Sequence, residues 1–178
     1  HHAAEVLHEQ GLPAAETRLV DAGGRLFLES QRFDRRGEFG RLSMLSLQTI
    51  DAEFIGQGSH WPTVMQALAK IHLVRPQHVL DALVLWGFGR LINNTDMHLG
   101  NLSLAIDGDI FRLLPVYDMC AMGFAPRSGE VLPFTFTTPD IGEKEGIPEE
   151  ILAVATDMAN SFWKALAKDP RISAEFRQ

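Results

Sequence analysis

Cysteine, positive charge and long apolar runs are all scarce in this sequence, and each shortage excludes a class of protein. A single cysteine, Cys120, excludes an internal disulfide framework and predicts a reducing compartment, the cytoplasm. The most apolar stretch, residues 79–92, contains Asp81 and Arg90 and falls short of the ~20 residues of a membrane span. The net charge of −7 argues against broad nucleic-acid or membrane binding, which requires clustered Lys and Arg.

The chain also lacks an initiator methionine and a secretory signal, and it begins His1-His2-Ala3-Ala4. Either a tag remnant stands at this end or the chain is a piece of a longer protein. Its 178 residues, 46% of them hydrophobic, are enough for one domain with a buried core.

Two pairs of short strand-like runs are each joined by a glycine-containing turn. Residues 17–21 and 26–33 flank Ala22-Gly23-Gly24, and residues 102–106 and 110–114 flank Asp107-Gly108-Asp109. Glycine supplies the positive φ of a tight turn, and Asp-Gly between alternating apolar runs is a strong hairpin signal. The sequence therefore predicts two β-hairpins.

Apolar residues at three- and four-residue spacing predict the helices. They cover residues 3–10, 63–74, 76–93 and 148–167. The third of these is apolar on most sides, so we expect it to be buried. The polar stretch that follows it, 93–101, is typical of a loop, as is the segment 123–140 with its apolar patch at 131–136. This order predicts an α+β fold, mostly helical after residue 60.

Polar side chains gather at two points of this predicted chain. Asp96, His98 and Asn101 lie in the polar loop, and Asp118 comes 22 residues after Asp96, at the far end of the second hairpin. Because a hairpin returns the chain to where it began, we expect Asp118 to lie close to Asn101. An amide oxygen beside a carboxylate suits Mg²⁺, with phosphates completing its octahedron, and the other carboxylate can accept a proton from an attacking hydroxyl. This arrangement is typical of phosphoryl transfer.

A purely structural interpretation stands beside this one, because Asn and Asp are common in loops for the turns they form. His98 taken alone is more typical of a partly buried structural histidine. A zinc hydrolase would need a second cluster of His or Asp ligands, and a nuclease would need further carboxylates. Asp107 and Asp109 are explained by the hairpin turn. The joint pattern of loop, spacing, hairpin and aspartate favours phosphoryl transfer.

Three motifs follow one another along the chain: FLESQRFDR at 27–35, NTDMHLGNLS at 94–103 and PVYD at 115–118. Together they resemble the hinge, the catalytic loop and the second metal motif of HipA-family serine/threonine kinases, the toxins of bacterial toxin–antitoxin pairs. The D-M-H-x-G-N form of the loop is similar to the YjjJ-like branch of that family. The resemblance implies a protein-kinase-like α+β fold, with ATP and Mg²⁺ as cofactors.

The resemblance also implies which residues carry the reaction. Asp96 would be the catalytic base that takes the proton of a protein hydroxyl, and Asn101 and Asp118 would hold Mg²⁺. The expected partners are a protein substrate and a DNA-binding antitoxin, with no direct contact of this acidic chain to nucleic acid or to a membrane.

Nucleotide contacts are implied at the hinge and in the loop. Gln31, Arg32 and Phe33 would meet the adenine, Asp34 would lie near the ribose, and His98 would sit under the nucleotide and order the loop. A purely structural interpretation is open here as well. Phe33 is also typical of a core residue, and Arg32 with Asp34 is typical of an ion pair.

Two departures from the family pattern have consequences. Gly100 stands where many members carry Lys, which removes a cation close to the phosphates. A Gly-rich phosphate loop and a strand Lys precede the hinge in kinases, whereas here the first lysine is Lys70. We therefore interpret residues 1–36 as a remnant of the small lobe with the hinge and 37–178 as the helical C-terminal lobe, and we expect little activity from these residues alone.

Two alternatives stay open. A pseudokinase or regulatory binding module would keep the fold without the reaction, although Asp96, Asn101 and Asp118 are intact. A small-molecule kinase of the aminoglycoside phosphotransferase type has a similar loop. It usually shows His-Gly before the base, where this chain has Asn94-Thr95.

Overall fold

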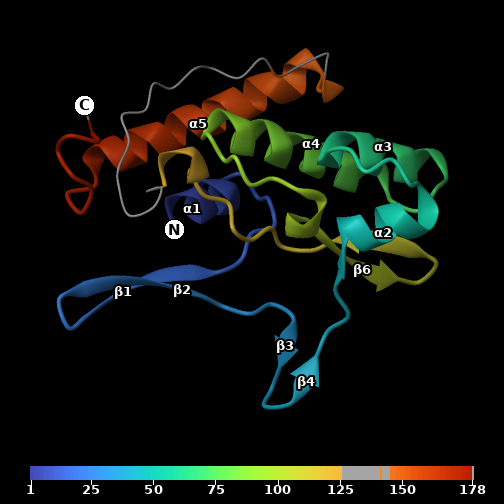
Figure 1. The fold of residues 1–178 in the computed structure, drawn as a ribbon, viewed down its shortest axis with the longest axis horizontal. Coiled ribbons are helices and arrows are strands. Elements are labelled where there is room, and N and C mark those ends of the chain that lie inside the picture. The colour runs from blue at the N-terminus through green and yellow to red at the C-terminus, as the bar shows by residue number, and fades with distance from the viewer. Residues whose placement is uncertain (126–140, 142–144, 178) are drawn as a thin grey trace.

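A computed structural model describes residues 1–125, 141 and 145–177. Its central element is the helix α4 (Pro76–Leu91), which packs between α5 (Glu149–Lys168) and α3 (Trp61–Lys70). The N-terminal helix α1 (His2–Glu9) lies against α5 (Figure 1). The chain ends therefore meet on one side of a helical body.

The predicted helices are confirmed, with ends set by local backbone geometry. Pro76 occupies the first turn of α4, where its missing N–H costs nothing. His72 and Asn93 have φ of 62° and 61°, and these left-handed residues end α3 and α4 earlier than the apolar pattern suggested. α4 is buried on most sides, as expected. Its Gly87 allows α5 to approach closely, since a Cβ there would lie 3.0 Å from the Cβ of Ala155.

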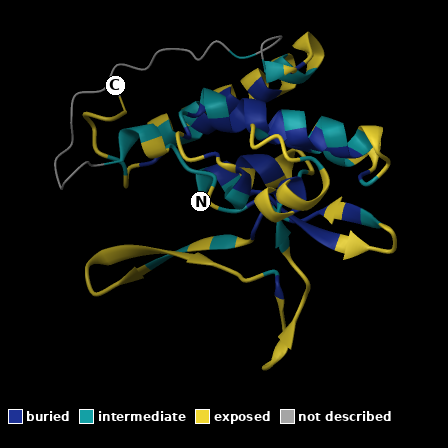
Figure 2. Cartoon of the chain, turned by 45° about the vertical axis from the view of Figure 1, so that its right-hand side comes forward, coloured by how far each residue is buried: buried dark blue, intermediate teal, exposed yellow. Residues whose placement is uncertain are grey.

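The first predicted hairpin is confirmed as β1 (Thr17–Ala22) paired antiparallel with β2 (Arg25–Ser30). Gly23 and Gly24 supply the positive φ of its turn. The second strand ends at Ser30 rather than at Phe33. This hairpin extends away from the helices, and every residue of β2 is exposed (Figure 2).

The second predicted hairpin is also confirmed, as β6 (Ser103–Asp107) and β7 (Ile110–Leu113). A third strand, β5 (Leu45–Ser46), pairs with β6 and leads straight into α2 (Leu47–Phe54), whose first turn is capped by Ser46. The sequence analysis predicted neither β5 nor α2. A separate two-stranded ribbon joins β3 (Arg35–Arg36) to β4 (Gly40–Arg41).

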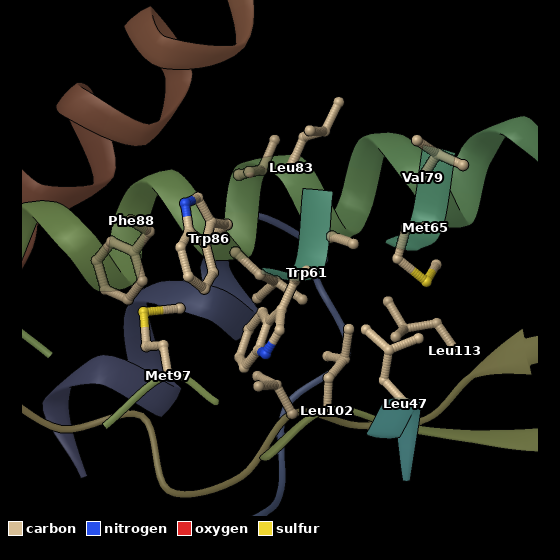
Figure 3. Packing of buried hydrophobic residues seen from close by; sticks show 14 of the residues in the cluster. Leu47, Trp61, Met65, Val79, Leu83, Trp86, Phe88, Met97, Leu102 and Leu113 are labelled. Atoms are coloured by element: carbon tan, nitrogen blue, oxygen red, sulfur yellow. The ribbon is translucent and has the colours of Figure 1, made fainter. Parts of the chain in front are cut away.

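The core lies between the helices and the three-stranded sheet. Trp61, Phe88 and Leu102 are almost fully buried, and Figure 3 shows Trp61 between Trp86 and Leu102. The Trp61 and Trp86 ring centroids are 5.7 Å apart. This packing holds α3 and α4 against the loop that leaves α4.

Two expectations concern parts that the structure leaves open. Most of the predicted loop 123–140, including its apolar patch at 131–136, lies outside the described residues; its start holds a 3₁₀ turn, Met122–Phe124. The division at residue 36 stays a prediction. Within the described part of the chain, no helix combines the length and the apolar character that a membrane span requires.

Candidate active site

The candidate catalytic loop begins where α4 ends and is shaped by Asn94. The Asn94 N–H donates to the Gly89 carbonyl at 2.8 Å, and its buried side-chain oxygen accepts the Asp96 N–H at 3.1 Å. This is an Asx-type turn, in which the amide side chain replaces a backbone acceptor. It fixes the backbone of Asp96 while leaving the carboxylate half exposed.

His98 faces that carboxylate. Its Nδ1 accepts the Gly100 N–H at 3.0 Å, so the neutral ring carries its proton on Nε2. Nε2 lies 3.7 Å from Asp96 Oδ1. The loop therefore aims an N–H group at the carboxylate predicted to be the base.

Asn101 closes the loop from the other side, at the end of the 3₁₀ turn Leu99–Asn101. Its Nδ2 donates to the Asp96 carbonyl at 2.7 Å. Because the amide nitrogen is engaged in this way, the amide oxygen is oriented away from the Asp96 carbonyl and is free to bind a cation. The predicted base and the predicted amide ligand are thus held next to each other.

The structure brings Asp118 to the same loop, as the hairpin argument predicted. Tyr117, directly before it, donates its hydroxyl to the Gly100 carbonyl at 3.1 Å and shares a 2.9 Å hydrogen bond with Ser103. Asp118 itself has a φ of 55°, a left-handed conformation that Asp tolerates better than most residues, and its side chain is exposed. The segment that follows β7 is therefore tied to Gly100, next to Asn101, one residue before Asp118.

The pKa of the Cys120 thiol reflects the negative charge of this region. Burial and, to a smaller extent, repulsion of the thiolate by the carboxylates of Asp118 and Asp96 together raise the pKa of the thiol to about 11. Both carboxylates therefore act on one point in space. The described residues contain no group of three or more His, Cys, Asp or Glu side chains placed so that they could hold a metal ion. A metal at Asn101 and Asp118 would depend on phosphate and water oxygens for its remaining ligands.

The predicted hinge residues lie beside this site, and some of their polar groups already form hydrogen bonds within the chain. The Arg32 guanidinium binds the buried Asp34 carboxylate through two hydrogen bonds of 2.6 Å and holds its pKa below the ordinary value. The backbone N–H of Gln31 donates to the Glu16 carbonyl at 2.8 Å. The ring of Phe33 lies 6.0 Å from that of Tyr117. The ion pair considered from the sequence is present, and Phe33 links the hinge to the segment after β7 that carries Asp118.

Sequence reasoning missed two residues that support the loop. Trp61, interpreted as a packing anchor, also donates its indole N–H to the His98 carbonyl at 2.9 Å. Gln48, on the unpredicted α2, places its amide oxygen 3.6 Å from where a Cβ at Gly100 would lie. Neither carries a local signal, because both reach the loop from distant parts of the sequence.

Gly100 owes its identity to His98, since a Cβ there would lie 2.8 Å from both Nδ1 and Cε1 of the imidazole. We expect Gly100→Ala to swing the ring away and break the Gly100–His98 hydrogen bond. The net change in unfolding free energy should be small, because a lost hydrogen bond (about 1 kcal/mol) offsets the ~0.4–1 kcal/mol gained from a less flexible unfolded chain.

The measurement is the ¹⁵N NMR shift of His98, which should report loss of the accepted hydrogen bond at Nδ1. Asp109→Ala, at the exposed turn of the β6–β7 hairpin, should leave it unchanged. An unmoved His98 resonance in Gly100→Ala would contradict the close packing.

Comparisons with known proteins agree on the fold. The model of the HipA-like C-terminal domain matches residues 1–172. The chain is 40% identical over 176 residues to Toxin YjjJ of Escherichia coli (strain K12), covering 98% of this chain and 39% of that protein. The chain thus spans about two fifths of that relative.

Two solved structures are similar over nearly the whole chain. HipA of Shewanella oneidensis MR-1, in a complex with HipB and operator DNA, has a TM-score of 0.65 at 19% identity, covering 98% of this chain and 50% of HipA. The proinflammatory kinase CtkA of Helicobacter pylori has a TM-score of 0.63 at 14% identity, covering 99% of this chain and 74% of CtkA. The predicted protein-kinase-like α+β fold is confirmed.

Proposed function

Because the chain belongs to the HipA-like C-terminal domain family, we propose that it carries the catalytic and metal-binding residues of an ATP-dependent serine/threonine protein kinase. Its fold is shared with CtkA, which is a kinase. The chain covers 39% of Toxin YjjJ and 50% of HipA, so we propose the activity for the longest natural protein that contains this chain.

One observation carries the proposal: the loop after α4 fixes a half-exposed carboxylate and an oriented amide oxygen together through the 2.7 Å bond from Asn101 to the Asp96 carbonyl. In the proposed reaction the hydroxyl oxygen of the substrate bonds to the γ-phosphorus of ATP. The bond from that phosphorus to the bridging oxygen breaks, and ADP leaves. Asp96 accepts the hydroxyl proton.

The donor set suits Mg²⁺, which prefers hard oxygen ligands and keeps several of its own waters. Asn101 Oδ1 and the exposed Asp118 carboxylate would hold it. When bound, it supplies positive charge against the phosphate oxygens. His98, whose Nε2 lies 3.7 Å from Asp96 Oδ1, would stand beside the base as well as under the nucleotide, the contact implied by the resemblance.

Gln31, Arg32, Phe33 and Asp34 remain the proposed edge of the nucleotide site. Phe33 supports this placement, because its ring lies against Tyr117, one residue from Asp118. Asp34 would meet the ribose only through whatever acceptor capacity Arg32 leaves free.

We further propose that the whole protein works in the cytoplasm as the toxin of a toxin–antitoxin pair, with a DNA-binding antitoxin as partner. The similarity to HipA, which is seen with HipB and operator DNA, supports this. The acidic charge of −7 favours an antitoxin, rather than this chain, as the DNA-contacting component.

The test is Mg²⁺-dependent ATP binding, measured by isothermal titration with the longest natural protein that contains this chain. Asp118→Asn should weaken binding of ATP with Mg²⁺ roughly tenfold, about 1.4 kcal/mol, and should leave Mg²⁺-free binding unchanged. The matched control is Asp109→Asn, which removes an exposed carboxylate from the hairpin turn. If Asp118→Asn bound ATP with Mg²⁺ as tightly as Asp109→Asn and the parent protein do, the metal site would be wrong.

A further inference from the structure

The β3–β4 ribbon concentrates positive charge on an otherwise acidic protein. Residues 32–41 contain four arginines and two acidic residues, whereas the chain as a whole carries a net charge of −7. Arg35, Arg36 and Arg41 lie on the two short strands and are all exposed. A Cβ at Gly40 would clash with the Arg36 carbonyl, so glycine lets the strands close over a tight turn.

The arginines of the ribbon are not neutralised from within. Arg35 and Arg41 are cross-strand partners, a placement in which like charges repel. Asp34 contacts the ribbon and already accepts two hydrogen bonds from Arg32, and Arg35 Nε lies 3.7 Å from the Oδ2 atom that one of these bonds occupies. Arg36 and Arg41 form no ion pair with any other described residue. The ribbon therefore presents a surplus of guanidinium groups.

An aromatic side chain stands at the tip of the same ribbon. Phe39 is 84% exposed, more than any other large apolar side chain among the described residues. Figures 1 and 2 show the ribbon extending away from the helical body, with its surface exposed. Aromatic and arginine side chains are both enriched in protein–protein interfaces, and the ribbon presents both on one exposed surface.

We propose that the β3–β4 ribbon docks an acidic, apolar-containing segment of the protein substrate. This inference rests on the proposed kinase function. The Leu42 N–H donates to the Asp34 carbonyl at 2.9 Å, which anchors the ribbon beside Phe33 and hence beside Tyr117 and Asp118. The tip is at most five residues from Asp34, or roughly 17 Å of extended chain. A docked peptide of about seven extended residues, spanning roughly 23 Å, would therefore cover the distance to Asp118.

The ribbon favours a protein over a nucleic acid as its partner. Glu38 shares the tip with Phe39 and interrupts the positive charge of the ribbon, which suits a few spaced acidic side chains better than the continuous charge of a phosphate backbone. Nucleic-acid binding also draws on a broad positive field, which a chain of net charge −7 does not provide. Acidic side chains with an apolar neighbour complement both the guanidinium groups and the aromatic ring.

The test is fluorescence anisotropy with the longest natural protein that contains this chain. The probe is a short fluorescein-labelled serine peptide flanked by glutamates and leucines, compared with a lysine-flanked peptide and a single-stranded oligonucleotide of similar length. Arg36→Glu/Arg41→Glu should weaken binding of the acidic peptide roughly tenfold, through lost attraction and new repulsion. Phe39→Ala should weaken it about fivefold. The control is Arg112→Glu/Arg177→Glu, which makes the same charge change at exposed sites outside the ribbon.

Binding that falls in both ribbon variants and not in the control supports the proposal. Equal loss in ribbon and control variants would show a general charge effect and overturn it, as would tighter binding of the oligonucleotide than of the acidic peptide. Because anisotropy does not require turnover, failure of docking is separable from failure of the kinase proposal. A protein that binds the peptide at the ribbon but transfers no phosphate would overturn only the assignment of that peptide as substrate.

Discussion

Asp96→Asn is expected to lower kcat for phosphoryl transfer by roughly a thousandfold, within the range that general base catalysis contributes. The amide is nearly the same size as the carboxylate, so the backbone bonds from Asn94 and Asn101 to residue 96 should persist. An amide cannot take the hydroxyl proton at neutral pH. ATP affinity should therefore stay within about twofold of the parent value, because the loss falls on the chemical step.

The control for this prediction is Asp109→Asn, which changes the charge equally at a distance from the loop. Its kcat should equal that of the parent. If Asp96→Asn kept kcat while losing ATP affinity, Asp96 would be a binding residue and the base would lie elsewhere. Kinetics with the longest natural protein that contains this chain, over a range of ATP concentrations up to saturation, distinguish the two results.

Trp61→Ala is expected to lower the free energy of unfolding by about 3–5 kcal/mol, the usual cost of truncating a large buried aromatic. Trp61 is almost fully buried against Trp86, and its removal also leaves the His98 carbonyl with one donor, the Asn101 N–H, in place of two. Urea denaturation measures the change. Phe39→Ala, which truncates an exposed aromatic, should cost less than about 0.5 kcal/mol.

Trp61→Phe separates the packing of Trp61 from its hydrogen bond. It keeps most of the apolar volume and removes the indole N–H, so the cost should fall to about 1–2 kcal/mol. If Trp61→Ala were no more destabilising than Phe39→Ala, the placement of Trp61 beneath the catalytic loop would be wrong.

Local chemistry explains why much of this site is predictable from the sequence. Asp-Gly at 107–108 specifies a tight turn, and that turn alone returns Asp118 to the loop that holds Asn101. The polar run after a buried helix likewise predicts a loop at Asp96. The apolar residues of α4 are by themselves enough to predict a buried helix, without knowledge of what packs against it.

The remaining features depend on long-range contacts, which leave no periodic signal. β5 has two residues and exists because Leu45 and Ser46 pair with β6, more than fifty residues away. The strand predicted to reach Phe33 ends at Ser30, and Phe33 lies instead against Tyr117. The hydrogen bond from Trp61 to the His98 carbonyl joins residues that are 37 positions apart in the sequence. Such contacts become visible only once the fold is formed.

The most direct test of the central claim is transfer of the labelled γ-phosphate of ATP to protein by the longest natural protein that contains this chain, with Mg²⁺ and cell extract as acceptor. We predict label on serine or threonine, which is stable in acid and released by alkali, that disappears with Asp96→Asn. A folded parent protein that binds ATP with Mg²⁺ but labels no protein would contradict the account, and the fold would then serve nucleotide sensing rather than catalysis.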